Sequence, residues 1–347
     1  MPGITDKKSV NGISTVSNMI DGMSEYCSPL FVVGMPRSGT KLLRRLIDNH
    51  SLIAIAPSET HFLPYFHDKF ECYGDLSKRK NFDRFWDDLK NFSFFINIHQ
   101  SDEIWKKEQF FNSLTAFTFQ DVFDTLLKKY AEFTGKVIYG DKTPEYLVQI
   151  PLLKNTFPNS KFIHIVRDAR DYCLSIRSAW NKNIYRAAHR WRTSIKKCRA
   201  DADRYCSEDY LEIRYETLID QPEKMLQKVC RFIDVPYEPK MALLKKPSEN
   251  LGDTKGRKVI VSQNYNKWKM AFSKKEIQGI ESIAGNLLVD LGYVDVENPG
   301  ADDIGKIRET FFKMMDGYYL ILFQMKQLKS FREGLKRIYF SYKTRLR

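Results

Sequence analysis

The segment from Leu30 to Leu46, LFVVGMPRSGTKLLRRL, constrains the fold of this chain more than any other stretch. Four apolar residues, Leu30 to Val33, enter a turn bounded by Gly34 and Gly39, and the apolar residues beyond the turn recur at helical spacing. The pattern predicts a strand, a tight loop and a helix. Because the N–H groups of such a loop and of the helix N-terminus point at one spot, the segment favours binding of an anion, and of a phosphate in particular.

The glycine spacing of this loop resembles the ATP-binding motif G-x-x-x-x-G-K-[ST], but its last two residues are transposed. In that motif the lysine reaches the β- and γ-phosphates, and the hydroxyl after it holds Mg²⁺. Here Thr40 comes before Lys41, so that both groups miss their places. The loop therefore disfavours a nucleotide kinase or NTPase.

Four further apolar runs predict strands that alternate with helical segments. These runs are Ile53 to Ala56, Lys136 to Tyr139, Lys161 to Val166 and Tyr210 to Tyr215. Strands separated by helices imply parallel pairing, with ligands bound at the carboxyl ends of the strands. The sequence thus predicts an α/β fold with a central parallel sheet of about five strands.

Other segments predict additions to this sheet. We expect a loose arm over residues 1–28, a main domain over 29–298 and a helical insertion rich in Phe and Trp over 67–134. A capping box of Ser273 and Glu276 opens a predicted helix that runs to Leu291. Residues 299–347 form a basic, helical C-terminal extension in this interpretation.

The end of that extension is strongly basic. From residue 326 onward, eight Lys or Arg residues stand against one acid and are interleaved with Leu, Phe, Ile and Tyr. The pattern is typical of an amphipathic helix on an anionic membrane, and equally of a solvated helix packed by one face.

The net charge of +13 favours anionic partners: phosphorylated cofactors, anionic glycans, membrane surfaces or nucleic acid. No run approaches the roughly 20 apolar residues of a spanning helix, and the polar start lacks a signal-peptide layout. We therefore expect a cytoplasmic protein, with membrane contact confined to the basic end. The six cysteines contain no C-x-x-C pair, so neither a zinc site nor a disulfide framework is expected.

Three motifs follow one another in the order seen in one enzyme family: PRSGT at 36–40, VRDARDYCLS at 166–175 and RYETL at 214–218. A later segment, SQNYNKWK at 262–269, is similar to another stretch of that family. The chain resembles the PAPS-dependent sulfotransferases, with the strongest similarity to the tyrosylprotein and bacterial glycan branches. The resemblance implies a P-loop NTPase-like three-layer sandwich, and PAPS as the sulfuryl donor, which leaves as PAP.

The resemblance also implies a set of cofactor-binding residues. The loop would hold the 5′-phosphosulfate, Arg167 and Ser175 the 3′-phosphate, Tyr215 would lie near the adenine, and Lys267 would contact a phosphate. The loop residues concerned are Pro36, Arg37, Ser38, Gly39, Thr40 and Lys41. The family usually has a second threonine where this chain has Lys41, which either supplies a charge in its place or points outward.

Three further side chains are implied in catalysis together with Arg37, which would neutralise the sulfonyl oxygens. Glu59 is the expected general base, with a pKa raised toward neutrality by a partly apolar cleft, and His61 is the second candidate. Lys142, in the segment DKTP, would stabilise the bridging oxygen; the alternative is a surface lysine paired with Asp141. No metal ion is implied.

The expected reaction is transfer of a sulfuryl group to an acceptor hydroxyl. We expect a carbohydrate acceptor, free or on a lipid or polymer, followed by a tyrosine side chain or a small hydroxylated metabolite. Two hypotheses of other classes remain: a nucleotide kinase or NTPase, and a non-catalytic binder of anionic polymers that would explain the positive charge without any site. Nucleic acid is not an expected partner, and the sequence does not indicate an oligomeric state.

Overall fold

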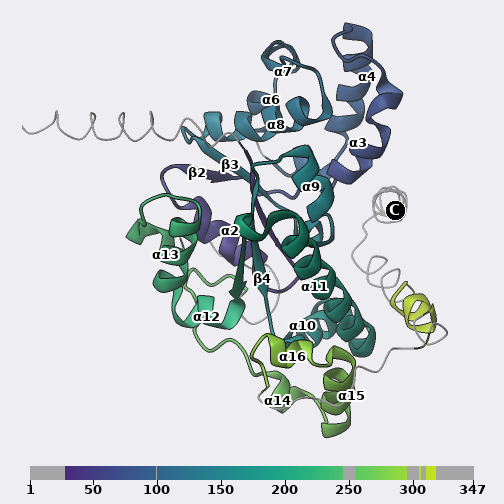
Figure 1. Cartoon of the computed structure of the whole chain (residues 1–347), viewed down its shortest axis with the longest axis vertical. Coiled ribbons are helices and arrows are strands. Elements are labelled where there is room, and N and C mark those ends of the chain that lie inside the picture. The colour runs from purple at the N-terminus through teal and green to yellow at the C-terminus, as the bar shows by residue number, and fades with distance from the viewer. Residues whose placement is uncertain (1–27, 99, 245–254, 295–304, 306–309, 318–347) are drawn as a thin grey trace, which may run out of the picture.

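Five parallel strands form one sheet in the order β2-β3-β1-β4-β5 (Figure 1). The computed structural model describes residues 28–98, 100–244, 255–294, 305 and 310–317. The strands are β1 Leu30–Gly34, β2 Ile53–Ile55, β3 Ile138–Lys142, β4 Lys161–Val166 and β5 Tyr210–Arg214. The predicted α/β class with a five-stranded parallel sheet is confirmed.

The position of β1 in this sheet brings distant segments together. In the register of the strands, Val32 lies opposite Lys142 of β3 on one side and Ile163 of β4 on the other. Since the strands are parallel, the segments that follow β1, β3 and β4 leave from the same edge of the sheet.

The third strand begins and ends later than the sequence predicts. Lys136 precedes the strand, and its ammonium group donates to the carbonyl of Ile53 at 2.8 Å. Gly140, taken from the sequence as the end of the strand, is instead paired with Leu30, and a Cβ at this position would lie 2.2 Å from the Leu30 carbonyl oxygen. The glycine therefore permits the close approach of two strands. It is not a turn residue.

Helices cover both faces of the sheet. One face packs on α2 Thr40–Asp48, α12 Tyr215–Asp220 and α13 Pro222–Phe232, and the other on α9 Ile150–Thr156, α10 Ala169–Trp180 and α11 Ile184–Cys206. Alternate strand residues face opposite layers, as Phe31 and Val32 do in β1. The result is the predicted three-layer sandwich, although Tyr215 begins α12 and does not end β5.

A helical group follows β2, and its last helix packs against β2 and β3. It comprises α3 Leu63–Lys69, η1 Phe70–Tyr73, α4 Arg79–Lys90, α5 Ser93–Ile96, α6 Ser101–Ile104, α7 Lys107–Ser113 and α8 Phe119–Phe133. Phenylalanines fill its centre, and the ring centroid of Phe62 lies 5.4–6.3 Å from five other rings. The helices thus begin slightly before the predicted insertion, and the aromatic side chains serve mainly as core.

Shorter elements complete the described chain: η2 Pro144–Val148, η3 Ser207–Asp209, η4 Pro239–Ala242, α14 Trp268–Ala271, α15 Lys274–Ala284 and α16 Leu287–Asp290. The capping box of Ser273 and Glu276 is present. The helix it opens does not reach Leu291, because Gly285 adopts φ 61° and ends it.

Several expectations fall outside the described residues. The arm over residues 1–27 and the basic end over 326–347 belong to these, so the domain boundaries stay predictions. Among the residues that the structure describes, no helix is long and apolar enough to cross a membrane.

We predict that Gly140→Ala destabilises the fold, because the added methyl group would meet a backbone carbonyl that cannot move without separating β1 from β3. Overpacking of this kind costs about 1–3 kcal/mol in the free energy of unfolding. Urea denaturation measures the change. Gly305→Ala, where a Cβ would meet no atom of the described residues within 4 Å, is the control, and equal stability of the two variants would contradict the prediction.

Candidate active site

The loop after β1 is shaped to receive an anion. Gly39 occupies the N-cap of α2 in a left-handed conformation, φ 92°, and no side chain caps this helix. Arg37 is also left-handed, φ 72°, and the Ser38 N–H donates to the Met35 carbonyl at 3.1 Å. The first N–H groups of a helix have no partner within it, so those of α2 are available to a ligand.

Tyr215 packs directly against this loop. A Cβ on Gly39 would lie 2.5 Å from the Tyr215 ring, so only glycine allows the contact. The guanidinium of Arg167 lies 4.6 Å from the centroid of the same ring, and the Asn264 side-chain amide donates to the tyrosine hydroxyl at 2.8 Å. An arginine, an aromatic ring and an amide therefore form one wall beside the loop.

Arg167 and Ser175 lie against the same loop, although they are about 130 residues away in sequence. Arg167 directly follows β4 and donates to the Arg37 carbonyl at 3.1 Å. The Arg37 side chain donates to the Ser175 hydroxyl at 3.2 Å. The Arg37 side chain thus reaches from the loop to α10, so that it connects the two expected phosphate sites.

Asp171 has a role that the sequence analysis missed. Its carboxylate accepts the backbone N–H groups of Asn266, Lys267 and Trp268 at 2.6, 3.0 and 3.2 Å. Burial raises the pKa of this carboxyl group, and the charge of Arg167 opposes that rise. Asp171 therefore fixes the segment that carries Lys267 onto α10, beside the loop.

The spacing of residues in α10 could have revealed this role. Arg167, Asp171 and Ser175 recur every four residues, which places them on one face of a helix and its approach. On the opposite side of the 263–268 segment, Asp220 accepts the Gln263 N–H at 3.0 Å and the Tyr265 hydroxyl at 2.5 Å. Two carboxylates thus hold the segment from two elements.

The remaining charges of the RDARD run are structural. Asp168 caps α10 and pairs with Arg170 at 2.7 Å in a buried site. Arg170 also binds Glu281 at 2.7 Å and lies 4.0 Å from the Trp268 ring centroid. This pair joins α10 to α14 and α15.

Lys142 ends β3 inside the protein, with 1% of its side chain exposed, and it forms an ion pair with Glu59. The alternative of a surface lysine paired with Asp141 is wrong, because adjacent strand residues face opposite sides of the sheet. The Asp141 side chain is fully buried, and burial raises its pKa to about 6.

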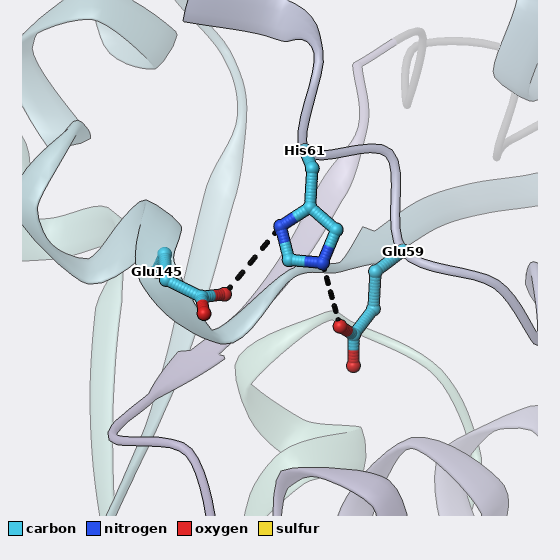
Figure 2. Close-up of side chains that lie close together, drawn as sticks. All are labelled: Glu59, His61 and Glu145. Atoms are coloured by element: carbon cyan, nitrogen blue, oxygen red, sulfur yellow. Dashed lines mark hydrogen bonds and ion pairs between the residues drawn. The ribbon is translucent and has the colours of Figure 1, made fainter. Parts of the chain in front are cut away.

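Glu59 also contacts His61, whose Nε2 lies 2.8 Å from the carboxylate (Figure 2). The Nδ1 atom of the same ring lies 3.6 Å from Glu145, a residue that the sequence analysis did not single out. The three side chains come from the segment after β2 and from η2, which follows β3.

The pKa of Glu59 differs from the expectation. Burial alone would raise this pKa, but the hydrogen bond from His61 and the charge of Lys142 outweigh burial and lower the pKa to about 2. For His61, burial lowers the pKa, while the hydrogen bond to Glu59 and the charge of Glu145 give a net rise. Glu59 is thus a stable carboxylate and not a group poised near neutrality.

Two buried polar atoms indicate that the site suits a phosphate-bearing cofactor such as PAPS. The Ser38 hydroxyl and the Arg167 Nε are both buried and have no hydrogen-bond partner in the described part of the chain. Thr40 and Lys41 lie in the first turn of α2, and Pro36 lies in the loop before it. The predicted cofactor residues of the loop, α10, α12 and the 263–268 segment therefore surround one place at the edge of the sheet.

Comparisons with known proteins agree with this arrangement. A model of the sulfotransferase family matches residues 29–239. A putative protein-tyrosine sulfotransferase of Caenorhabditis briggsae is 23% identical over 78% of this chain and 91% of its own length. The nodulation protein NoeE of Sinorhizobium fredii is also 23% identical, over 78% of this chain and 68% of its own length.

A solved structure, the sulfotransferase domain from the curacin biosynthetic pathway, has the same fold. It superposes with a TM-score of 0.51 at 23% identity and covers 77% of this chain and 98% of that domain. The family model spans more than half of the chain, including the loop after β1, Lys142 and Arg167. The chain therefore belongs to the sulfotransferase family, as an enzyme that takes its sulfuryl group from PAPS.

Proposed function

We propose that this sulfotransferase sulfates a carbohydrate hydroxyl, and that Glu59 accepts the hydroxyl proton. The observation that supports the proposal most directly is the ion pair between buried Lys142 and partly exposed Glu59 at the end of β3. It places a cation and a carboxylate next to each other at the edge of the sheet where the phosphate-binding loop begins.

These two groups match the needs of the reaction. PAPS, when bound, supplies an activated sulfuryl group, and sulfuryl transfer, like phosphoryl transfer, depends chiefly on positioning and charge stabilisation. Lys142 would bind the bridging oxygen that gains negative charge, while Glu59 would hold and deprotonate the acceptor hydroxyl. Arg37, a loop residue whose side chain donates to Ser175, would bind the oxygens of the transferred group.

The charges beside Glu59 support a neutral polyol as the acceptor. Glu59 and Glu145 are partly exposed and lie beside His61, and Lys142 is already paired. Carboxylates accept hydrogen bonds from sugar hydroxyls, whereas they would repel an anionic acceptor peptide. A tyrosine acceptor remains the second candidate, because several relatives are named protein-tyrosine sulfotransferases.

We predict that Arg167→Ala weakens binding of PAP by at least about tenfold, since a charged hydrogen bond contributes about 1.5–3 kcal/mol. Isothermal titration calorimetry with PAP measures the change. Arg204→Ala, which removes an arginine from the last turn of α11, is the matched control. No PAP binding to the unaltered protein, or equal affinity of the two variants, would contradict the assignment.

We also predict that Gly39→Ala weakens PAP binding, because the methyl group would displace either Tyr215 or the loop. Gly256 has a similar left-handed φ, 75°, with open space around its Cβ position. Gly256→Ala therefore introduces the same backbone strain without the clash. An equal loss of PAP affinity in both variants would show that the Tyr215 contact is unimportant.

The acceptor and the catalytic pair can be tested by PAP release from PAPS. We expect chitotetraose to be sulfated faster than a tyrosine-containing peptide, and Glu59→Gln to lower the rate about 10²-fold or more while PAP binding changes little. Glu132→Gln, an exposed substitution on α8, is the control. Faster sulfation of the peptide would overturn the carbohydrate proposal, and an active Glu59→Gln variant would overturn the assignment of the base.

A further inference from the structure

We infer that Glu59, His61 and Glu145 form a proton relay, in which the proton taken from the acceptor passes through Glu59 to His61 while Glu145 fixes the imidazole. The inference rests on the proposed function of Glu59 and extends it. His61 and Glu145 act through Glu59 and are therefore positioning residues.

The geometry of the three side chains is that of a chain. His61 lies between two carboxylates, with Nε2 facing Glu59 at 2.8 Å and Nδ1 facing Glu145 at 3.6 Å (Figure 2). The Glu145 Oε2 atom is buried and has no hydrogen-bond partner among the described residues. Catalytic hydrogen bonds are often long before substrate binds, so this oxygen is placed to receive the Nδ1 proton.

The backbone around His61 is held in place by the segment after β3. The Thr60 N–H donates to the Thr143 hydroxyl at 3.0 Å, and the Thr60 hydroxyl lies 2.8 Å from the Tyr146 hydroxyl. The backbone of His61 adopts φ 48°, a conformation that residues other than glycine rarely take and that recurs at functional sites. Glu145 lies between Thr143 and Tyr146 in sequence, so the residues that fix His61 also fix its second carboxylate.

The relay removes a difficulty with Glu59 as a base acting alone. With a pKa of about 2, its carboxylate has little affinity for a proton. The low value belongs to the state in which the Nε2–H of His61 donates to Glu59; when Nε2 is free, the charge of Lys142 still lowers the pKa of Glu59, against the opposing effect of burial. An imidazole whose pKa is raised above its ordinary value is the better final acceptor.

The charged and titratable groups around His61 favour a protonated ring. Glu59 faces the ring from its own segment and Glu145 faces it from η2; the charge of Asp141 in β3 also raises the pKa of the ring, and Lys142 pairs with Glu59. The ligand atoms of Glu59, His61 and Glu145 lie within 4.8 Å of one another, which could suggest a metal ion. However, the two carboxylates face different ring nitrogens and Glu59 is already paired with a lysine, so the arrangement suits a proton better than a cation.

The step can be written with all bonds balanced. The acceptor oxygen forms a bond to sulfur as the bond from sulfur to the phosphate oxygen of PAPS breaks. The proton of the acceptor hydroxyl moves to Glu59, and a proton moves from Glu59 to the Nε2 atom of neutral His61. Glu145 accepts a hydrogen bond from Nδ1–H throughout, which selects the tautomer with a free Nε2 and stabilises the imidazolium that forms.

This relay predicts a specific pH dependence. It requires neutral His61 at the start of the step, so the rate falls as the pH drops below the pKa of His61. Glu145→Gln removes a negative charge beside the ring and lowers that pKa, so the acidic limb of the pH–rate profile moves to lower pH. The same variant loses at least about tenfold in kcat at the plateau, because the imidazolium is less stabilised. Glu145→Asp should recover part of both effects.

Two measurements on the full chain test the relay. The first is the pH dependence of PAP release from PAPS with chitotetraose, for the unaltered protein and for Glu145→Gln, Glu145→Asp and the control Glu132→Gln. The second is NMR titration of ¹⁵N-labelled histidine side chains, with the His61 signals identified by their loss in His61→Ala. The titration needs neither PAPS nor an acceptor.

The outcomes separate the relay from the proposed function. A lower His61 pKa in Glu145→Gln, together with a shifted acidic limb, supports the relay. An unmoved His61 pKa, an unmoved limb, or nearly full activity of His61→Ala overturns it. Absence of turnover or of PAP binding in the unaltered protein contradicts the proposed function instead, and the NMR titration alone then decides whether Glu145 controls His61.

Discussion

The site depends on one constraint of the sheet: β1 runs between β3 and β4, parallel to both and in register with both. This pairing brings the loop after β1 close to Lys142 and Arg167, although each of them lies about 100 residues or more beyond the loop in the sequence. Gly140 allows the closest part of the β1–β3 contact, and Gly39 allows Tyr215 to close the other side. Where backbone or ring atoms approach this closely, the type of residue is fixed by space and not by chemistry.

Two kinds of charge surround the loop, and they have different tasks. The Arg167 side chain donates to the Arg37 carbonyl and lies over the Tyr215 ring, and the Arg37 side chain donates to Ser175. We expect both guanidinium groups to bind a phosphate-bearing cofactor. Asp168, Arg170 and Asp171, in the same short run of sequence, instead hold α10 to α15 and to the 263–268 segment. These paired charges therefore position α10 and the 263–268 segment, next to which Arg37 and Arg167 lie.

Much of this arrangement could be predicted from the sequence, because strand–loop–helix patterns and charged motifs at strand ends are local signals. The strand Lys161–Val166 was predicted to the residue. Gly140 misled the prediction of β3, since a glycine required by a neighbouring strand looks like a turn in one dimension. The expected raised pKa of Glu59 was wrong, because it considered burial without the two positive partners that only the fold supplies. Glu145 was missed for the same reason.

The pairing of Lys142 with Glu59 has a consequence for the order in which substrates bind. In the protein described here the lysine neutralises the carboxylate, which keeps the carboxylate a weak base. A donor whose bridging oxygen draws the lysine toward itself would leave Glu59 less compensated and therefore more basic. Competence to deprotonate an acceptor would then arise only after the donor has bound. Such coupling favours an ordered kinetic sequence, with the donor binding first and the acceptor second, because Glu59 and the donor both interact with the ammonium group of Lys142.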